Sequence, residues 1–446
     1  MEGDGKTART AGQVSRVPAV DRRTVLAMGG ALALAGIGRG FEAGAQERPV
    51  DATGPRPVNH LRAALARHTD SGFVPGVVAA VWRDGEAQVE VLGRQAFDGA
   101  PMQRNSIFRI ASISKALTAA AAMILVEEGK LGLDDPVDEL LPELKGRRVL
   151  RSIDAELDDT VPAERSITLR DLLTLRFGLG AIMVYPPQYP IQQAMAAAEL
   201  TPNEKLFAHP PDVFMQRLGQ LPLAAQPGES WLYHTGVDVA GVLIARASGQ
   251  TLGEFMRTRV FSPLGMNDTG FYVPENKIER FVTAYRSNPE TGELVVFDGP
   301  RGVFSRPPVF EAGGSGCVST ADDYLKFCRM LLGKGELDGV RLLSPASVEE
   351  MTRDQITAAQ KEDPNASLFF NGHSGWGLGM AVALRQDEPW LTPGRFGWFG
   401  GYGTSAYTDP RERLIGVLMT QRLMDSPQPP PTYTDFWTAA YQPAGE

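Results

Sequence analysis

The stretch 112–128 places the strongest constraint on how this chain can fold. Residues 116–126 are nearly all apolar, and Gly129 ends the helical pattern. A helix that is apolar on every side must be buried on most sides, so other elements have to enclose it. The chain can supply such a core, because a protein of 446 residues buries about three quarters of the surface that its unfolded chain exposes.

The order of strand-like and helix-like patterns indicates how this core is built. Apolar runs at 77–82 and 88–92 predict a hairpin near the front of the chain, and runs at 402–408 and 414–420 predict strands near its end. Helical spacing predominates between them. We therefore expect an α/β (α+β) fold, in which an antiparallel sheet built from both chain ends is flanked by helices and carries an inserted, mainly helical lobe.

The expected boundaries follow from the same patterns. The sheet lobe should cover about 58–108 and 310–442, and the helical lobe about 109–309. Thr320 and Asp323 are placed to form a capping box at a helix start. Helices are expected at 58–69, 112–128, 168–175, 211–218, 237–247, 252–260, 320–332 and 435–441.

Residues 21–45 have the layout of an export signal. Arg22-Arg23 precedes an uncharged run, 25–37, and Ala43-Gly44-Ala45 stands before Gln46. A basic pair, a short apolar run and a small-residue cleavage site are typical of a secretory signal, and the arginine pair resembles a twin-arginine signal. We expect 1–45 to be cleaved at about Ala45/Gln46. The mature chain, 46–446, would be periplasmic or secreted and without a membrane anchor; a retained signal is the alternative.

Charge and composition exclude several classes of function. The net charge is −9, and removal of 1–45 changes it to −11, because that segment holds six basic and four acidic residues. An acidic chain is poorly suited to phosphate backbones, so we expect no nucleic-acid partner. Five histidines without HxH or HExxH spacing and two cysteines predict neither a metal nor another cofactor. Cys317 and Cys328 are expected to be buried, unpaired thiols, since ~12 Å of predicted helix separates them.

Ser112 and Lys115 stand where the apolar helix begins. Residues three apart on a helix share one face, and a helix start offers free backbone N–H groups to a developing negative charge. Lys115 could activate the Ser112 hydroxyl as a base, if its pKa is lowered, or through its field. The alternative is that Ser112 caps the helix and Lys115 is solvated. A lysine at the mouth of a buried helix is costly unless paired or used, which favours the catalytic interpretation.

Segment 227–236 holds a second candidate, Tyr233. A tyrosine can relay a proton when a nearby ammonium lowers its pKa from about 10. The alternative is an ordinary core aromatic after a Pro-Gly turn. We expect His234 to be structural, because on a strand or a helix it would point away from its neighbour's site.

Segment 396–404, FGWFGGYGT, interleaves four glycines with aromatic residues. Glycines at the start of a strand mark a place where the backbone lies close to another group. A free backbone N–H here could form an oxyanion hole together with that of Ser112; the alternative is a tight bulge packed with aromatics. The G-x-S-x-G elbow is absent, because 372–375 is followed by Trp376, so a Ser-His-Asp hydrolase has no support.

Taken in this order, the S-x-x-K motif, the tyrosine motif and the glycine-rich strand resemble the serine β-lactamase and penicillin-binding-protein superfamily. The resemblance is closest to the class C β-lactamase-like branch, which includes the family VIII carboxylesterases. It extends over nearly all of 58–422. Besides the three motifs it rests on 75–77 (PGV), 108–112 (FRIAS), 133–137 (LDDPV), 167–173 (ITLRDLL), 263–266 (PLGM) and 318–323 (VSTADD).

The resemblance assigns roles to individual residues. It implies that Ser112 is the acylated nucleophile, that Lys115 activates it, and that Tyr233 is the general base and later the acid for the leaving group. It also implies an oxyanion hole formed by the backbone N–H groups of Ser112 and Gly401. The implied substrate contacts are Thr235, Trp398, Phe399 and Gly400.

Two departures from the family pattern bear on activity. Thr235 stands where lactamases of this type have asparagine, and Trp398-Phe399-Gly400 stands where they have Lys-Thr-Gly. The cation that would hold the carboxylate of a β-lactam or a D-alanine peptide is therefore missing, and the W-x-G form resembles the esterase branch.

We therefore expect an exported serine hydrolase that cleaves small esters through an acyl-enzyme on Ser112, its partner being a small ester or amide substrate. Two alternatives stay open. One is a β-lactamase or D,D-peptidase-type enzyme acting on β-lactams or peptidoglycan peptides. The other is a non-catalytic binding protein that retains the fold.

Overall fold

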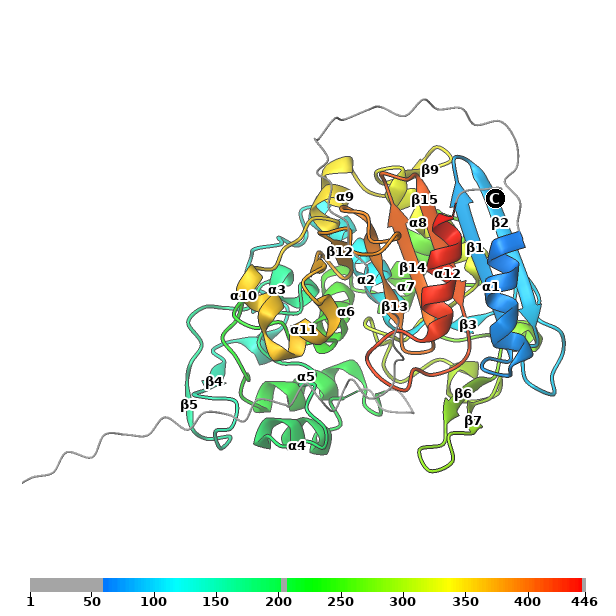
Figure 1. The fold of residues 1–446 in the computed structure, drawn as a ribbon. Helices are drawn as coiled ribbons and strands as arrows, with labels where there is room; N and C mark the ends of the chain where they lie inside the picture. The colour runs from blue at the N-terminus through cyan, green and yellow to red at the C-terminus, as the bar shows by residue number, and fades with distance from the viewer. Residues whose placement is uncertain (1–58, 202–206, 443–446) are drawn as a thin grey trace, which may run out of the picture. The chain divides into compact units, whose positions relative to one another are not determined.

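A seven-stranded antiparallel sheet forms the centre of the fold (Figure 1). This computed structural model describes residues 59–201 and 207–442. The strands, in their order across the sheet, are β11 (Ser374–Trp376), β12 (Ala381–Ala383), β13 (Phe396–Gly400), β14 (Thr404–Asp409), β15 (Leu414–Met419), β1 (Gly76–Arg83) and β2 (Glu86–Gly93). The two ends of the chain meet where β15 pairs with β1, from Val78 opposite Met419 to Arg83 opposite Leu414. The expected fold class is confirmed.

The predicted front hairpin is also present. β1 and β2 are joined by Asp84 and Gly85, whose φ angles are 50° and 100°. A two-residue turn with both φ angles positive matches the twist of the flanking strands, and Asp-Gly is a favoured pair for it. Near the other end, the expected strand 402–408 begins only at Thr404, because 401–403 form the turn after β13, with Gly403 at φ 74°.

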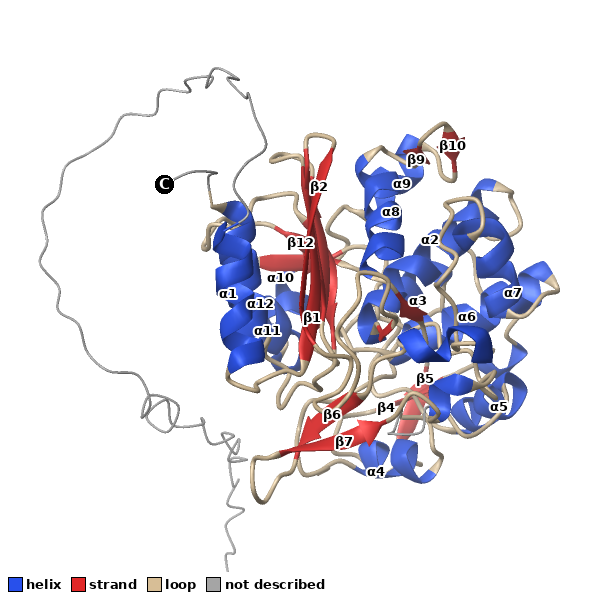
Figure 2. Ribbon diagram, turned by 90° about the vertical axis from the view of Figure 1, so that its right-hand side faces the viewer, coloured by secondary structure: helices blue, strands red, loops and turns tan. Residues whose placement is uncertain are grey.

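Helices cover both faces of the sheet. Figure 2 shows α1 (Asn59–Asp70) and α12 (Pro431–Tyr441) on one face, and α8 (Ala321–Leu332) and α2 (Ser114–Glu127) on the other. α12 starts earlier than the expected 435, since a proline is well suited to the first position of a helix.

The predicted capping box at the start of α8 is only half formed. Thr320 accepts a hydrogen bond from the Asp323 N–H, at 3.1 Å. The Asp323 carboxylate instead accepts a hydrogen bond from the Asp268 N–H, at 2.7 Å. This contact ties the start of α8 to the 267–270 loop.

The apolar helix at 112–128 is buried as expected. Residues 114–125 of α2 are all buried, and α2 packs against α6 (Thr235–Ser248), α7 (Leu252–Met256) and α9 (Pro345–Met351). Its first turn differs from the prediction, because residues Ala111–Ile113 form a short 3-10 helix, η1, before the α-helix begins. Ser112 therefore lies in a tighter turn than a regular α-helix.

No helix in residues 59–201 and 207–442 is long and apolar enough to cross a membrane. The expected export signal lies outside the described residues. The lobe boundaries stay a prediction, since 56–446 form one unit.

Shorter elements complete the described chain. The remaining helices are α3 (Leu169–Leu173), α4 (Pro190–Ala197), α5 (Pro211–Gln220), α10 (Ala358–Glu362), α11 (Pro364–Phe370), the 3-10 helices η2 (Pro142–Leu144), η4 (Glu275–Arg280) and η5 (Val303–Ser305), and the π-helical turn η3 (Arg257–Phe261). The remaining strands pair as β3 (Phe108–Arg109) with β8 (Val318–Ser319), β4 (Arg148–Leu150) with β5 (Thr160–Pro162), β6 (Ala284–Ser287) with β7 (Leu294–Asp298), and β9 (Glu336–Leu337) with β10 (Val340–Arg341).

Candidate active site

Ser112 lies in the tight turn between β3 and α2. The Ile110 N–H donates to the Cys317 carbonyl at 3.0 Å, which continues the pairing of β3 with β8. Ala111 has a φ of 45°, in the left-handed region that residues with a side chain rarely adopt. Strained residues of this kind persist where the surrounding contacts hold them, often at active sites. The turn places Ser112, which is 9% exposed, at the start of α2.

Lys115 points back to Ser112 from the first turn of α2. Its Nζ donates to Ser112 Oγ at 3.1 Å and to the Gly314 carbonyl at 2.8 Å, and it lies 3.1 Å from His234 Nδ1. The side chain is fully buried, and burial lowers its pKa to about 7, although the nearby Asp238 carboxylate acts in the opposite direction. Lys115 is thus a buried amine that loses its proton near neutral pH, and the interpretation of a solvated charge is wrong.

Tyr233 completes the group around Ser112. Its phenol is hydrogen bonded to Ser112 and accepts a hydrogen bond from Trp398 Nε1 at 2.7 Å. Lys115 Nζ lies 4.6 Å from the centre of its ring. Burial raises the pKa of Tyr233 to about 12. This direction is the opposite of the expected one, because desolvation of the phenolate outweighs the hydrogen bonds to Ser112 and Trp398, which lower the pKa.

His234 contacts the site, and the expectation that it points away is wrong. Its φ and ψ angles are 82° and −67°, and the Thr235 N–H donates to the Tyr233 carbonyl at 3.2 Å. These are the angles and the hydrogen bond of a γ-turn of the rarer, strained form. The prediction assumed a strand or a helix, on which neighbouring side chains diverge. The γ-turn instead brings both Tyr233 and His234 to Lys115.

The two aromatic site residues expected on β13 lie against each other beside Tyr233. Trp398 is buried and faces Tyr233, whereas Phe399 is half-buried and stacks on Trp398 with ring centres 4.4 Å apart. Phe369 of α11, which the sequence did not single out, lies 4.9 Å from the Tyr233 ring centre. The sequence carries no periodic signal for it, since it reaches the site only through the packing of α11.

Gly400 brings the end of β13 directly against residues 110–113, the turn that carries the expected nucleophile Ser112 and is called the nucleophile turn below. A Cβ atom at this position would lie 2.5 Å from the Ile110 carbonyl oxygen, so only glycine fits. Gly401 follows at once, where a Cβ atom would meet no atom within 4 Å. Thr235, expected to contact substrate, is buried as the first residue of α6, where its N–H closes the γ-turn. The neighbouring His234, and not Thr235, contacts Lys115.

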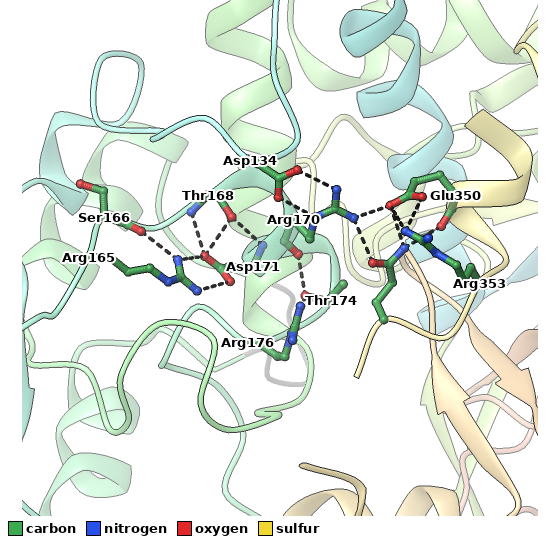
Figure 3. A network of polar contacts seen from close by, with 11 residues as sticks. Asp134, Arg165, Ser166, Thr168, Arg170, Asp171, Thr174, Arg176, Glu350 and Arg353 are labelled. Atoms are coloured by element: carbon green, nitrogen blue, oxygen red, sulfur yellow. Dashed lines mark hydrogen bonds and ion pairs between the residues drawn. The ribbon is translucent and has the colours of Figure 1, made fainter. Parts of the chain in front are cut away.

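Figure 3 shows a network of ion pairs and hydrogen bonds around Arg170 and Asp171 of α3. Asp171 accepts hydrogen bonds from Arg165 at 2.6 and 2.8 Å, and it closes a capping box with Thr168. Arg170 donates to Asp134 at 2.6 Å and contacts Glu350. These ion pairs fix α3 to neighbouring loops and to α9.

α3 in turn supports the catalytic segments. The Leu173 carbonyl accepts a hydrogen bond from Trp376 Nε1 at 3.1 Å. The Leu172 carbonyl oxygen lies where a Cβ atom on Gly236 would be 2.4 Å away, so α6 begins in direct contact with α3. The γ-turn at His234 therefore rests on a rigid base.

Cys317 and Cys328 are buried and unpaired, as expected, and burial raises the pKa of each thiol to about 12. Within the described residues, no group of three His, Cys, Asp or Glu side chains is placed to hold a metal ion.

The family profile described as Beta-lactamase matches residues 61–434. This chain belongs to the β-lactamase family. It is 40% identical over 371 residues to protein Rv1367c of Mycobacterium tuberculosis, with 82% of this chain and 90% of the relative covered. It is 30% identical over 395 residues to esterase EstB of Burkholderia gladioli, covering 80% of this chain and 91% of the relative.

A solved structure shows the same fold. EstCE1, described as a hydrolase with promiscuous acyltransferase activity, superposes with a TM-score of 0.70 at 24% identity, covering 86% of this chain and 98% of that one. The resemblance to the serine β-lactamase superfamily and its esterase branch is therefore confirmed. This β-lactamase family member is a serine hydrolase of the esterase-like kind.

Proposed function

We propose that this protein hydrolyses small carboxylic esters through an acyl-enzyme on Ser112. The observation that carries the proposal is the contact between Ser112 Oγ and the buried Lys115 Nζ, at 3.1 Å. With its pKa lowered to about 7, Lys115 is partly unprotonated at neutral pH and can accept the hydroxyl proton. The likeness to a named esterase supports the reaction class.

Acylation follows from the proton-binding properties of the two groups beside Ser112. Ser112 Oγ attacks the ester carbonyl carbon while Lys115 Nζ takes its proton. Tyr233, whose pKa is raised to about 12, keeps its proton at neutral pH and is suited to donate it to the departing alkoxide. Lys115 then returns a proton to Tyr233. In this scheme Lys115 is the base and Tyr233 the acid, whereas the family resemblance assigns the base to Tyr233.

Deacylation repeats these steps with water. A water molecule attacks the acyl carbon and gives a proton to Lys115. Ser112 Oγ then leaves and takes that proton from Lys115 Nζ, which lies 3.1 Å away. The backbone N–H groups of Ser112 and Gly401 stabilise the oxyanion in both halves of the reaction. Their segments are held together because Gly400 packs on Ile110.

The surroundings of Tyr233 favour neutral substrates. Trp398 replaces the lysine of the Lys-Thr-Gly motif, and its N–H is already bonded to Tyr233 at 2.7 Å. Phe369 and Phe399 extend the aromatic surface on either side. An apolar surface without a cation binds an acyl chain better than a carboxylate. We therefore expect esters with uncharged acyl groups to be turned over faster than acidic ones.

The test is a burst experiment with p-nitrophenyl acetate, butyrate and octanoate, read together with the intact mass of the protein. We expect a burst of one equivalent and an acyl mass on Ser112, with both lost in Ser112→Ala. Unchanged turnover in Ser112→Ala would overturn the proposal.

The same mass measurement separates the alternatives. An adduct on Ser112 formed faster by benzylpenicillin than by the esters would favour a β-lactam or D,D-peptidase-type enzyme. A folded protein whose Ser112 reacts with neither the esters nor a fluorophosphonate would favour a non-catalytic binding protein.

A further inference from the structure

Lys115, His234, Asp238 and Gly314 form a closed ring of polar contacts beside Ser112. Lys115 Nζ lies 2.8 Å from the Gly314 carbonyl oxygen and 3.1 Å from His234 Nδ1. His234 Nε2 lies 3.1 Å from Asp238 Oδ2, and Asp238 Oδ1 accepts the Gly314 N–H at 2.8 Å. Lys115 and Asp238 are fully buried, and the side chain of His234 is 10% exposed. A Cβ atom on Gly314 would lie only 3.0 Å from Asp238 Oδ1 and 3.1 Å from His234 Nε2.

The ring matters because a base must present its lone pair to the proton it takes. A neutral lysine amine carries two N–H groups and one lone pair. The Gly314 carbonyl can only accept, so it takes one N–H. When His234 Nδ1 also accepts, the second N–H is used, and the lone pair is left facing Ser112 Oγ. An Nδ1 that carried a proton would instead attract this lone pair away from Ser112.

Asp238 decides which nitrogen of His234 holds the proton. Asp238 Oδ2 and His234 Nε2 are buried and have no aligned hydrogen bond in the described residues, not even to each other, but they face each other at 3.1 Å. A carboxylate accepts hydrogen bonds and does not donate them, which places the proton on Nε2 and leaves Nδ1 as the acceptor. Burial and Lys115 lower the pKa of His234, so the ring is neutral and carries one proton.

We infer that His234 and Asp238 are positioning residues that direct the lone pair of Lys115 toward Ser112. The inference rests on the proposed function, in which Lys115 is the base. In the described residues, the titratable side chains facing the ring are Ser112 from η1, Lys115 from α2, and Tyr233, His234 and Asp238 from the γ-turn and α6; the loop at 313–314 contributes backbone only.

The variant Asp238→Asn tests the tautomer directly. The Gly314 N–H requires an acceptor, so the amide oxygen of the new side chain stays there and its NH₂ group faces His234 Nε2. A donor at that position forces the proton onto Nδ1. In a Ser-His-Asp triad, replacing the aspartate by asparagine likewise leaves the geometry in place and imposes the wrong histidine tautomer. We expect the acylation rate to fall about 100-fold or more.

The matched variant is His234→Asn. An asparagine tolerates the positive φ angle, and its Oδ1 can replace Nδ1 as the acceptor without depending on a tautomer. We expect a loss of about 10-fold or less in acylation. Because the introduced asparagine no longer needs Asp238, adding Asp238→Asn to this variant should cost less than about 5-fold, which makes the two substitutions strongly non-additive.

The experiment measures single-turnover acylation by p-nitrophenyl acetate for the wild type, both single variants and the double variant, from pH 5 to 9. The acylation rate should rise with pH as Lys115 loses its proton. In Asp238→Asn we expect this rise at lower pH, because loss of the carboxylate disfavours the Lys115 ammonium. The inference would be overturned if Asp238→Asn lowered the acylation rate by the same factor in the wild type and in His234→Asn. It would also be overturned if the rate of Asp238→Asn rose at the same pH as that of the wild type. Absence of an acyl-enzyme in the wild type would overturn the proposed function instead.

Discussion

At the scale of the residue, Lys115 combines full burial with three polar contacts. Its Nζ touches a hydroxyl, a carbonyl oxygen and an imidazole nitrogen, and the Asp238 carboxylate acts on its charge. Burial disfavours the ammonium, and this effect exceeds the favourable effect of Asp238. The result is a buried amine whose pKa of about 7 suits the role of base that we propose for it.

The pH dependence follows from this equilibrium. The base acts in its neutral form, so kcat/KM for a neutral ester should rise with pH through about 7 and then stay level, since Tyr233 titrates only at about 12. Tyr233→Phe should lower kcat/KM by about 100-fold, because it removes the proposed acid. It should leave the rise of kcat/KM at about pH 7 in place, because the proposed base, Lys115, is still present. A pH–rate profile of both proteins checks the prediction. If kcat/KM of Tyr233→Phe no longer rises with pH through about 7, Tyr233 is the base.

At the scale of the element, the contact between β13 and the nucleophile turn aligns the two halves of the site. Thr404 Oγ1 donates to the Ile110 carbonyl at 3.1 Å, and Gly400 lies against the same carbonyl. The strand thereby places Trp398 against Tyr233 and leaves Gly401 beside the turn of Ser112. The proposed nucleophile and the proposed oxyanion donor thus come from distant parts of the chain, since Ile110 and Thr404, which this bond joins, are 294 residues apart.

Substitution at Gly400 tests this contact. In Gly400→Ala the new methyl group would lie 2.4 Å from Thr404 Oγ1 and 2.5 Å from the Ile110 carbonyl oxygen. The strand must shift, and we expect the free energy of unfolding in urea to fall by about 1–3 kcal/mol, with kcat/KM falling as well. Gly401→Ala is the stability control, because its methyl group meets no atom within 4 Å. Equal stabilities of the two variants would contradict the argument.

At the scale of the whole molecule, the sheet depends on segments from both ends of the chain. α12 packs on α1 and on β15, where Gly416 leaves room for the Trp437 ring. The guanidinium of the buried Arg395 lies between the rings of Tyr407 and Trp437, at 3.9 and 4.1 Å from their centres. Trp437 Nε1 also donates to Ser405 Oγ at 2.9 Å, which joins α12 to β14.

Loss of the Trp437 ring should therefore destabilise the entire fold. In Trp437→Ala we expect the free energy of unfolding to fall by about 3–5 kcal/mol, the usual cost of removing a buried aromatic side chain. Urea denaturation followed by circular dichroism measures it. Val309→Ala, at a side chain that is 60% exposed, should have almost no effect. A small loss in Trp437→Ala would show that α12 is not part of the cooperative core.

Export is a further proposal at this scale, and it rests on the sequence of 21–45. Expression in a bacterial host with a twin-arginine pathway should give a periplasmic protein whose N-terminal residue, read by mass spectrometry, is Gln46. Replacement of Arg22-Arg23 by two lysines should keep the protein in the cytoplasm with its full N-terminus. Periplasmic recovery of both forms at equal levels would contradict the assignment.

The sequence by itself determined the periodic elements and the motifs. The helix at 112–128, the front hairpin and the sheet built from both ends follow from local patterns of apolar residues, because burial has to match the period of each element. The S-x-x-K motif also placed Ser112 and Lys115 together, since residues three apart in a helical turn are neighbours. Family, fold and reaction class could be predicted at this level.

Only the tertiary structure decided how the charges around Ser112 are set. The γ-turn at His234 has no periodic signature, and its strained angles exist because α3 supports the start of α6. The direction of the pKa of Tyr233 depends on burial by residues distant in the chain, among them Phe369 and Trp398. Sequence patterns record which residues repeat along an element, whereas desolvation and lone-pair direction depend on what surrounds a side chain in three dimensions.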